Sequence, residues 1–185
     1  MNRDVLHCAK CGTAVEQKIP EGDNRIRQVC PQCHYIHYQN PLPVAGCILT
    51  WEDRILLAKR AIEPRYGFWT LPAGFMEVGE TATEAAAREA MEETAATAEA
   101  LELYGVYSIP HIGQLYMMYR GICKDGYARA ADESLEVNFV LPDEIPWDEL
   151  AFPVIRHTLH RFLKDRKKNR FQVFHEALDY RSRST

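Results

Sequence analysis

Apolar residues become dense and regularly placed only after residue 40. From Val44 the chain reads VAGCILTW, then a polar turn at Glu52 and Asp53, then RILLAKR, a pattern that predicts a hairpin of half-buried strands. Further strands are predicted over 98–106, 114–123 and 135–141, and helices over 82–94 and 154–167. Strands outnumber helices and do not alternate strictly with them. The pattern therefore predicts an α+β fold built on a mixed sheet.

The first forty residues differ from the rest of the chain. They are polar, contain cysteines and lack a periodic apolar pattern, and the segment ends at Asn40, Pro41 and Pro43, residues that interrupt regular structure. A length of 185 residues allows one domain of ordinary size and a small appendage. We therefore predict a small domain over 1–40 and a larger one over 41–185.

Composition limits the class of protein. Apolar residues make up 46% of the chain and charged residues 26%, a balance typical of globular domains. No window approaches the roughly 18 consecutive apolar residues of a membrane-spanning helix. The opening segment MNRDVLHCAK lacks the apolar centre of a signal peptide. We expect a cytoplasmic protein that does not enter a membrane.

The net charge of −4 argues against a protein that binds duplex nucleic acid, because such proteins cluster lysine and arginine against the phosphate backbone. One basic run occurs at the end of the second predicted helix, where cations favour the negative end of the helix dipole. It comprises Lys164, Arg166, Lys167, Lys168 and Arg170. We interpret it as a solvated helix end, and expect no nucleic-acid partner.

Four of the six cysteines form two CxxC pairs, with residues 12–29 between the pairs. Two such pairs give four thiolates that enclose a tetrahedral zinc ion and leave no open position for chemistry. The predicted zinc ligands are Cys8, Cys11, Cys30 and Cys33. The site is therefore predicted to be structural.

The remaining cysteines and the histidines near the pairs have simpler interpretations. Cys47 and Cys123 lie within apolar strand patterns and are expected to be buried packing residues. His7, His34 and His37 flank the CxxC pairs and could replace a thiolate, but four cysteines already satisfy the preference of structural zinc for four ligands.

An acidic segment, LPAGFMEVGETATEAAAREAMEETAA, spans residues 71–96. Its glycine-containing loop leads into a helix whose start is marked by Thr81 and Glu84, the spacing of a capping box. Glu89 and Glu93 are four positions apart, so both lie on one face of that helix. Like charges at this spacing require a compensating cation.

The nearest cation in sequence is Arg88, which we expect to compensate Glu92 or Glu84 and to project away from the face of Glu89 and Glu93. That leaves these two carboxylates for a hard divalent ion such as Mg²⁺ or Mn²⁺. The alternative is a charged surface helix with intrahelical ion pairs.

The loop and helix together resemble the Nudix box, whose glycine, glutamate and Arg-Glu positions recur here at the family spacing. The matching residues are Gly74, Glu80, Arg88, Glu89, Ala90, Glu92, Glu93 and Ala96. Ala95 departs from the pattern, since the family usually has a glycine that ends the helix there. The cysteine pairs and the segments GFWTLPAGFMEVGE and ESLEVNFVLPDEIPW look like the zinc-ribbon Nudix hydrolases of bacteria and plant plastids that split FAD and ADP-ribose.

The resemblance implies an α/β/α sandwich with a mixed sheet, preceded by a zinc ribbon. It makes Glu89 and Glu93 direct metal ligands, places Glu92 at a metal or its water, and lets the Ala73 carbonyl complete the metal shell. Glu80 would pair with Arg88 and brace the loop against the helix.

The family also draws a carboxylate from beyond the box, as a further ligand or as the base for the attacking water. Glu133 and Glu136 are the candidates, and Glu133 better matches the family spacing to Phe139. Each could instead be a solvated loop charge.

The implied reaction is attack by a metal-activated water on a diphosphate, with FAD or ADP-ribose as substrate and AMP as a product. The motif SQPWPFPxS of NADH-preferring relatives is absent, and Pro110 resembles the downstream proline of the ADP-ribose group. Trp69, Phe68 and Tyr116 could stack on adenine or flavin, although each could equally pack in the core.

Three other functions remain open at the level of the sequence. The chain could be an NADH or other dinucleotide pyrophosphatase, a non-catalytic regulator that binds ADP-ribose, or a nucleic-acid module built on the ribbon. Retention of all three box carboxylates argues against a pure binder. The ribbon mixes basic and acidic residues and presents no basic stripe. A homodimer is compatible with the sequence.

Overall fold

The computed structural model describes residues 5–180, and the chain divides into two compact units between Pro41 and Leu42. The N-terminal unit is a three-stranded antiparallel sheet of β1 (Glu16–Lys18), β2 (Arg27–Val29) and β3 (Ile36–His37). Among its described residues, the buried apolar side chains are Pro20, Val29 and two of the cysteines, with Cys30 fully buried. The cysteines therefore occupy the place of a hydrophobic core in this unit.

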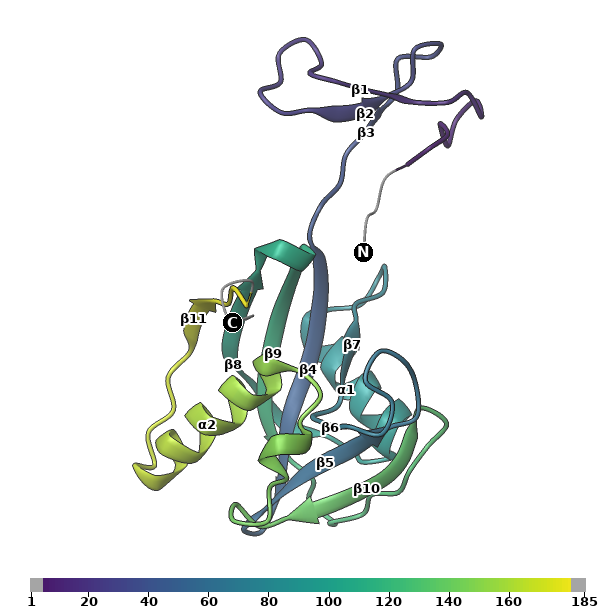
Figure 1. Ribbon diagram of the computed structural model, residues 1–185. Helices are drawn as coiled ribbons and strands as arrows, with labels where there is room; N and C mark the ends of the chain where they lie inside the picture. The colour runs from purple at the N-terminus through teal and green to yellow at the C-terminus, as the bar shows by residue number, and fades with distance from the viewer. Residues whose placement is uncertain (1–4, 181–185) are drawn as a thin grey trace. The chain divides into compact units, whose positions relative to one another are not determined.

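The second unit is built on a mixed sheet (Figure 1). Its strand order is β10-β5-β4-β9-β8-β11, with the short strands β6 (Trp69–Thr70) and β7 (Ala73–Phe75) paired to β5 and β4. The six path strands are β4 (Leu42–Trp51), β5 (Arg54–Arg60), β8 (Glu99–Ile109), β9 (Gln114–Ile122), β10 (Ser134–Val140) and β11 (Phe174–Ala177). The β4–β9 and β8–β11 pairs are parallel and the others antiparallel.

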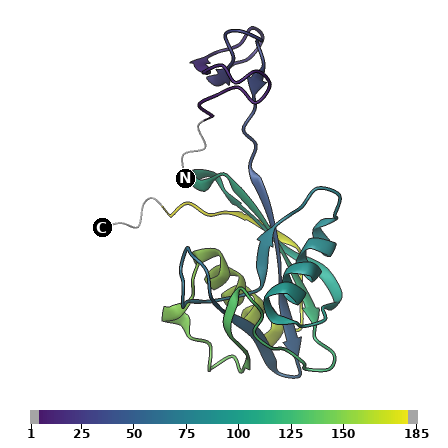
Figure 2. The same cartoon turned by 90° about the vertical axis from the view of Figure 1, so that its right-hand side faces the viewer.

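Two helices cover opposite faces of this sheet (Figures 1 and 2). Helix α2 (Pro153–Lys167) packs large side chains such as Leu159 and Phe162 against Ile48 and Leu57. Helix α1 (Ala82–Thr94) packs on the other face. Successive strand residues point to opposite faces, and each face buries its own core. The α+β class and the layered α/β/α arrangement are confirmed.

Small residues bring α1 close to the sheet. Ala85, Ala86 and Ala90 are fully buried against β4 and its neighbours, and the Cys47 thiol donates to the Ala86 carbonyl at 3.6 Å. Because alanine adds little between helix and strand, the helix backbone approaches closely. The flank of α1 that carries its glutamates therefore lies beside β7.

The hairpin and both long helices predicted from the apolar pattern are observed as β4, β5, α1 and α2. Cys47 and Cys123 are buried, as expected. Several short elements were not predicted: β6, β7, β11 and the 3₁₀ turns η1 (Pro110–Ile112) and η2 (Trp147–Glu149). Among the described residues, no helix is long and apolar enough to cross a membrane.

Candidate active site

The loop before α1 is fixed by backbone hydrogen bonds to its own carboxylates. The Thr81 hydroxyl accepts from the Glu84 N–H at 3.2 Å, and the Glu84 carboxylate accepts from the Thr81 N–H at 2.8 Å. This is the predicted capping box, and it satisfies helix N–H groups that have no partner within the helix. One turn earlier, the Glu77 N–H donates to Glu80 at 2.6 Å. The loop therefore enters α1 in one defined conformation.

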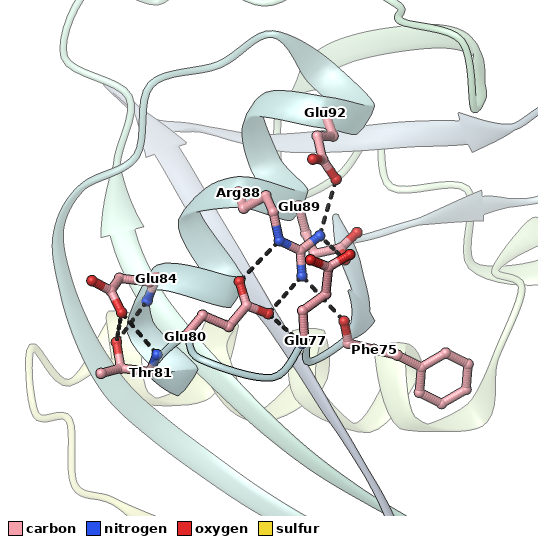
Figure 3. A network of polar contacts seen from close by, with 8 residues as sticks. All are labelled: Phe75, Glu77, Glu80, Thr81, Glu84, Arg88, Glu89 and Glu92. Atoms are coloured by element: carbon pink, nitrogen blue, oxygen red, sulfur yellow. Dashed lines mark hydrogen bonds and ion pairs between the residues drawn. The ribbon is translucent and has the colours of Figure 1, made fainter.

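Arg88 joins this loop to the helix (Figure 3). Its Nε and Nη2 donate to the two oxygens of Glu80 at 3.0 and 2.8 Å, and Nη2 also donates to the Phe75 carbonyl at 3.1 Å. A paired, fork-to-fork geometry makes this one of the stronger kinds of ion pair. The Arg88 hydrogen bonds, with that from the Glu77 N–H, lower the pKa of Glu80 to about 2. Glu80 is therefore ionised throughout the neutral range.

The expectation that Arg88 avoids the face of Glu89 and Glu93 is wrong. Its Nη1 donates to Glu89 at 2.7 Å and to Glu92 at 3.0 Å. The long side chain bends along the helix, so even the adjacent residue lies within its reach, which a helical-face argument does not capture. Glu89 and Glu92 share one guanidinium group, as Figure 3 shows.

Glu93 has no such partner. Glu93 is 5% exposed as a residue and Glu89 8%. The Glu93 carboxylate accepts a hydrogen bond from the Ala73 backbone, but its Oε2 is buried without a hydrogen-bond partner among the described residues. Burial raises the pKa of Glu93 to about 8, and the neighbouring charge of Glu89 adds to the shift. Burial also raises the pKa of Glu89.

Two buried carboxylates on one helix face fit a divalent cation. Without a cation each ionised group is costly to bury, whereas a bound divalent ion removes both the desolvation cost and the mutual repulsion. Oxygen-only donors suit hard ions. Gly74 keeps the space clear, because a Cβ at this position would overlap the Glu89 carboxylate.

These residues lie around a cavity of about 1010 Å³, here called the α1 cavity. The predicted site residues in its lining are Ala73, Arg88, Glu89, Glu92, Glu93 and Glu133. Among the lining residues that the sequence did not single out are Arg60, Arg129 and Phe75. Phe75 is 52% exposed, and its ring points away from the Arg88 network (Figure 3). Its place directly after Gly74 was the one signal that could have identified it.

The segment that carries Glu133 is attached to the end of α1. The Arg129 N–H donates to the Thr94 carbonyl at 2.9 Å, and the Ala131 N–H donates to the Glu93 carbonyl at 3.4 Å. These carbonyls accept no hydrogen bond within the helix. The segment therefore satisfies two carbonyl groups at the C-terminal end of α1. Ala95 adopts the left-handed conformation usually taken by glycine, with φ 50°. The departure from the family pattern therefore leaves the local turn unchanged.

The two candidate bases differ in position. Glu133 lines the α1 cavity, and its charge acts on both Glu89 and Glu93. Glu136 lies on β10, where it accepts from Asn138 at 2.6 Å and lies 4.0 Å from the Lys59 ammonium. It is not part of the cavity lining.

The three aromatic residues predicted as stacking candidates lie outside the lining of the α1 cavity. Trp69 is buried in the core beneath α2, and Tyr116 packs against the same core. Phe68 lies under the Arg65 guanidinium at 5.3 Å. Aromatic identity and nearness in sequence did not separate packing residues from cavity residues.

The four cysteines of the N-terminal unit converge on one point. All their sulfur atoms lie within 4.8 Å of one another, with Cys8–Cys33 at 3.5 Å and Cys11–Cys30 at 3.4 Å. Tetrahedral zinc with bonds of about 2.3 Å separates its sulfurs by roughly 3.8 Å. The Lys10 and Cys33 N–H groups donate to Cys8 and Cys30 sulfur, each at 3.4 Å. The cluster therefore fits a structural zinc ion.

Family models match both units of the chain. The NUDIX domain model matches residues 40–162, and the Nudix N-terminal zinc-ribbon model matches residues 7–39. A crystal structure of a NUDIX hydrolase from Nitrosomonas europaea is 47% identical, with a TM-score of 0.88 over 94% of this chain and 100% of that one.

Two relatives of named activity are more distant. An ADP-ribose pyrophosphatase from Methanocaldococcus jannaschii is 35% identical over 64% of this chain and 71% of its own length. The NAD-capped RNA hydrolase NudC of Vibrio vulnificus is 27% identical over 89% of this chain, which spans 63% of that protein. With the family model covering most of the chain and a closely similar structure covering nearly all of it, the chain belongs to the NUDIX domain family and carries that family's N-terminal zinc ribbon.

Proposed function

We propose that this chain hydrolyses the diphosphate linkage of a nucleoside diphosphate derivative, ADP-ribose or FAD, and releases AMP. The observation that carries the proposal is the pair Glu89 and Glu93, buried on one helix face at the α1 cavity, with one oxygen of Glu93 left without a partner among the described residues. A cavity of about 1010 Å³ has room for a substrate larger than a mononucleotide.

The metal ligands are Glu89, Glu92 and Glu93 with the Ala73 carbonyl, all in the lining of the cavity, and Mg²⁺ or Mn²⁺ suits this oxygen donor set. When bound, such an ion lowers the pKa of a coordinated water and neutralises charge that develops on the phosphate oxygens. Four thiolates fill the coordination shell of the ribbon zinc, so the zinc takes no part in the reaction.

The protein supplies orientation and a base. Glu133 takes the proton of the attacking water, whose oxygen forms the new bond to phosphorus as the anhydride bond breaks. The Arg88–Glu80 ion pair holds the Gly74 loop against α1, so the ligands keep their spacing. AMP leaves with ribose 5-phosphate from ADP-ribose, or with FMN from FAD.

Several observations support the choice of substrate. The relative from Methanocaldococcus jannaschii is named an ADP-ribose pyrophosphatase. Pro110, which resembles the downstream proline of the ADP-ribose group, begins η1 at the end of β8. The motif SQPWPFPxS of NADH-preferring relatives is absent. Phe75, exposed in the cavity lining, offers a ring face for adenine or flavin.

A second candidate is a pyrophosphatase for NADH or for NAD-type ends of RNA. It is favoured by the similarity to an NAD-capped RNA hydrolase over 89% of the chain. The two candidates share the same chemistry and differ only in the group attached to the diphosphate.

A substrate panel distinguishes them. The test compares kcat/KM for ADP-ribose, FAD, NADH and a deoxynucleoside triphosphate at one Mg²⁺ concentration, with products identified by chromatography. We expect ADP-ribose or FAD to lead. A lead of more than about tenfold for NADH or the triphosphate, equivalent to about 1.4 kcal/mol, would show that the substrate class is wrong while leaving the hydrolase chemistry intact.

A further inference from the structure

The cations of the α1 cavity fall into two groups. Three arginines and no lysine occur in its lining, against seven carboxylates. Arg88 is fully engaged, since it binds Glu80, Glu89 and Glu92. Among the described residues, Arg60 and Arg129 make no ion pair with any carboxylate, although acidic side chains surround them in the lining.

Arg60 is held in place by neutral groups. It ends β5, its Nε donates to the Pro64 carbonyl at 2.9 Å, and its guanidinium lies over the Phe152 ring at 5.2 Å from the centroid. This arrangement fixes the plane of the guanidinium and leaves its two terminal amino groups available. A planar guanidinium with free terminal N–H groups matches the oxygens of a phosphate.

Arg129 is positioned by its backbone. Its N–H group is bound to the Thr94 carbonyl at the end of α1, while its exposed side chain has no polar partner among the described residues. It therefore stands at the rim of the same cavity, on the segment that also carries Glu133. An exposed arginine without a partner keeps its conformational freedom and binds more weakly than a held one.

We propose that Arg60 and Arg129 bind the diphosphate of the substrate directly, Arg60 as a preoriented clamp inside the α1 cavity and Arg129 as a weaker contact at its rim. The inference rests on the proposed function, because it assigns phosphate contacts to that same cavity. It explains how a cavity with seven carboxylates accepts a polyanion beyond what a bound metal neutralises. Neither residue belongs to the box motif.

The test measures binding without turnover. The non-hydrolysable α,β-methylene analogue of ADP is titrated into the intact protein at fixed Mg²⁺ by calorimetry, without a chelator that would strip the ribbon. Arg60→Gln should raise Kd by about tenfold and Arg129→Gln by about threefold. Each loses a charge-assisted contact, and the contact of Arg60 is the better preoriented of the two. Arg60→Lys keeps the charge but loses the fork, and should recover only part of the affinity.

Arg65→Gln is the matched control. Arg65 lies five residues from Arg60, over the Phe68 ring, and does not line the cavity, so its loss should leave Kd unchanged. The Kd of the wild type should also rise more steeply with salt than that of the double variant Arg60→Gln, Arg129→Gln. Equal melting temperatures for Arg60→Gln and the wild type separate phosphate binding from a structural role of the Pro64 contact.

Binding by Arg60→Gln within about twofold of the wild type would overturn the proposal. Arginine-dependent binding in a protein that hydrolyses no member of the substrate panel would instead refute the proposed function and leave these phosphate contacts standing. Hydrolysis of ADP-ribose or FAD with unchanged KM in both glutamine variants would refute the phosphate contacts and leave the proposed function standing.

Discussion

At the scale of single residues, Glu93 combines deep burial with an oxygen that lacks a partner among the described residues. The sequence predicted that Glu89 and Glu93 share a helix face, because that follows from helical spacing alone. It did not predict that Arg88 reaches Glu89, because the path of a long flexible side chain depends on what surrounds it. Arg60 and Arg129 were missed for a related reason: they come from other elements and only the fold brings them to the cavity.

Glu93→Gln removes one proposed metal ligand at nearly constant volume. We expect turnover to fall by about 10³-fold, equivalent to about 4 kcal/mol of barrier, with the fold intact. Steady-state rates at saturating Mg²⁺ and circular dichroism together test this. Near-normal turnover in the variant would exclude Glu93 as a ligand that the reaction needs.

Stability should depend on pH through the same side chain. The pKa of Glu93 is about 8 in the folded protein against an ordinary value of 4.5, so the folded state binds the extra proton between these values. Its contribution to stability is therefore fully present below about pH 4.5 and is lost as pH rises through about 8. In buffer without divalent ions, the melting temperature of wild type should fall over this range more than that of Glu93→Gln. Added Mg²⁺ should reduce the difference, and parallel curves without Mg²⁺ would contradict the assignment.

At the scale of elements, local signals located the long pieces and missed the short ones. The capping residues and the apolar pattern predicted α1, and the β4–β5 hairpin followed from its own residues. By contrast, β6, β7 and β11 are two to four residues long, too short for any period to show. They form because neighbouring strands offer backbone partners, which is information from the whole sheet. The site depends on this, because β7 carries Ala73 and Gly74.

The left-handed turn that ends α1 provides an element-scale test. Ala95 has φ 50°, a conformation that costs a residue with a Cβ about 1 kcal/mol. Ala95→Gly should therefore raise the free energy of unfolding by somewhat less than this, since glycine also loses more backbone entropy on folding. Urea denaturation measures the change. Ala98→Gly is the control, because Ala98 packs against the core without a positive φ and its loss should destabilise the protein.

At the scale of the whole molecule, the two units are stabilised in different ways. The larger unit buries two hydrophobic cores on either side of its sheet, whereas the described part of the ribbon buries little besides Val29 and two of its four cysteines, Cys8 and Cys30. The spacing of the two CxxC pairs was sufficient to predict the cluster, because thiolates that enclose one ion must converge. We therefore expect folding of the ribbon to be coupled to zinc binding.

Cys30→Ser should separate the two units in experiment. We expect lower thermal stability or solubility and loss of the zinc, while the Mg²⁺ dependence of hydrolysis is unchanged in the protein that remains folded. Elemental analysis of the native protein, purified without chelator, should find one zinc per chain. A zinc-free native protein, or an altered Mg²⁺ requirement in the variant, would contradict the structural role.

The hydrogen bond between Arg88 and Glu89 has a consequence for the affinity of the metal. A divalent ion that binds Glu89 competes with the Arg88 guanidinium group, which lies 2.7 Å from that carboxylate. Metal binding therefore exchanges one counter-ion of Glu89 for another. The free energy of metal binding is then a difference between two attractions. An arginine that binds Glu89 less firmly would therefore increase the affinity for the metal. Arg88→Lys, with a point charge in place of the fork, should hold Mg²⁺ more tightly and yet turn over more slowly, because the loop that Glu80 secures would lose its anchor.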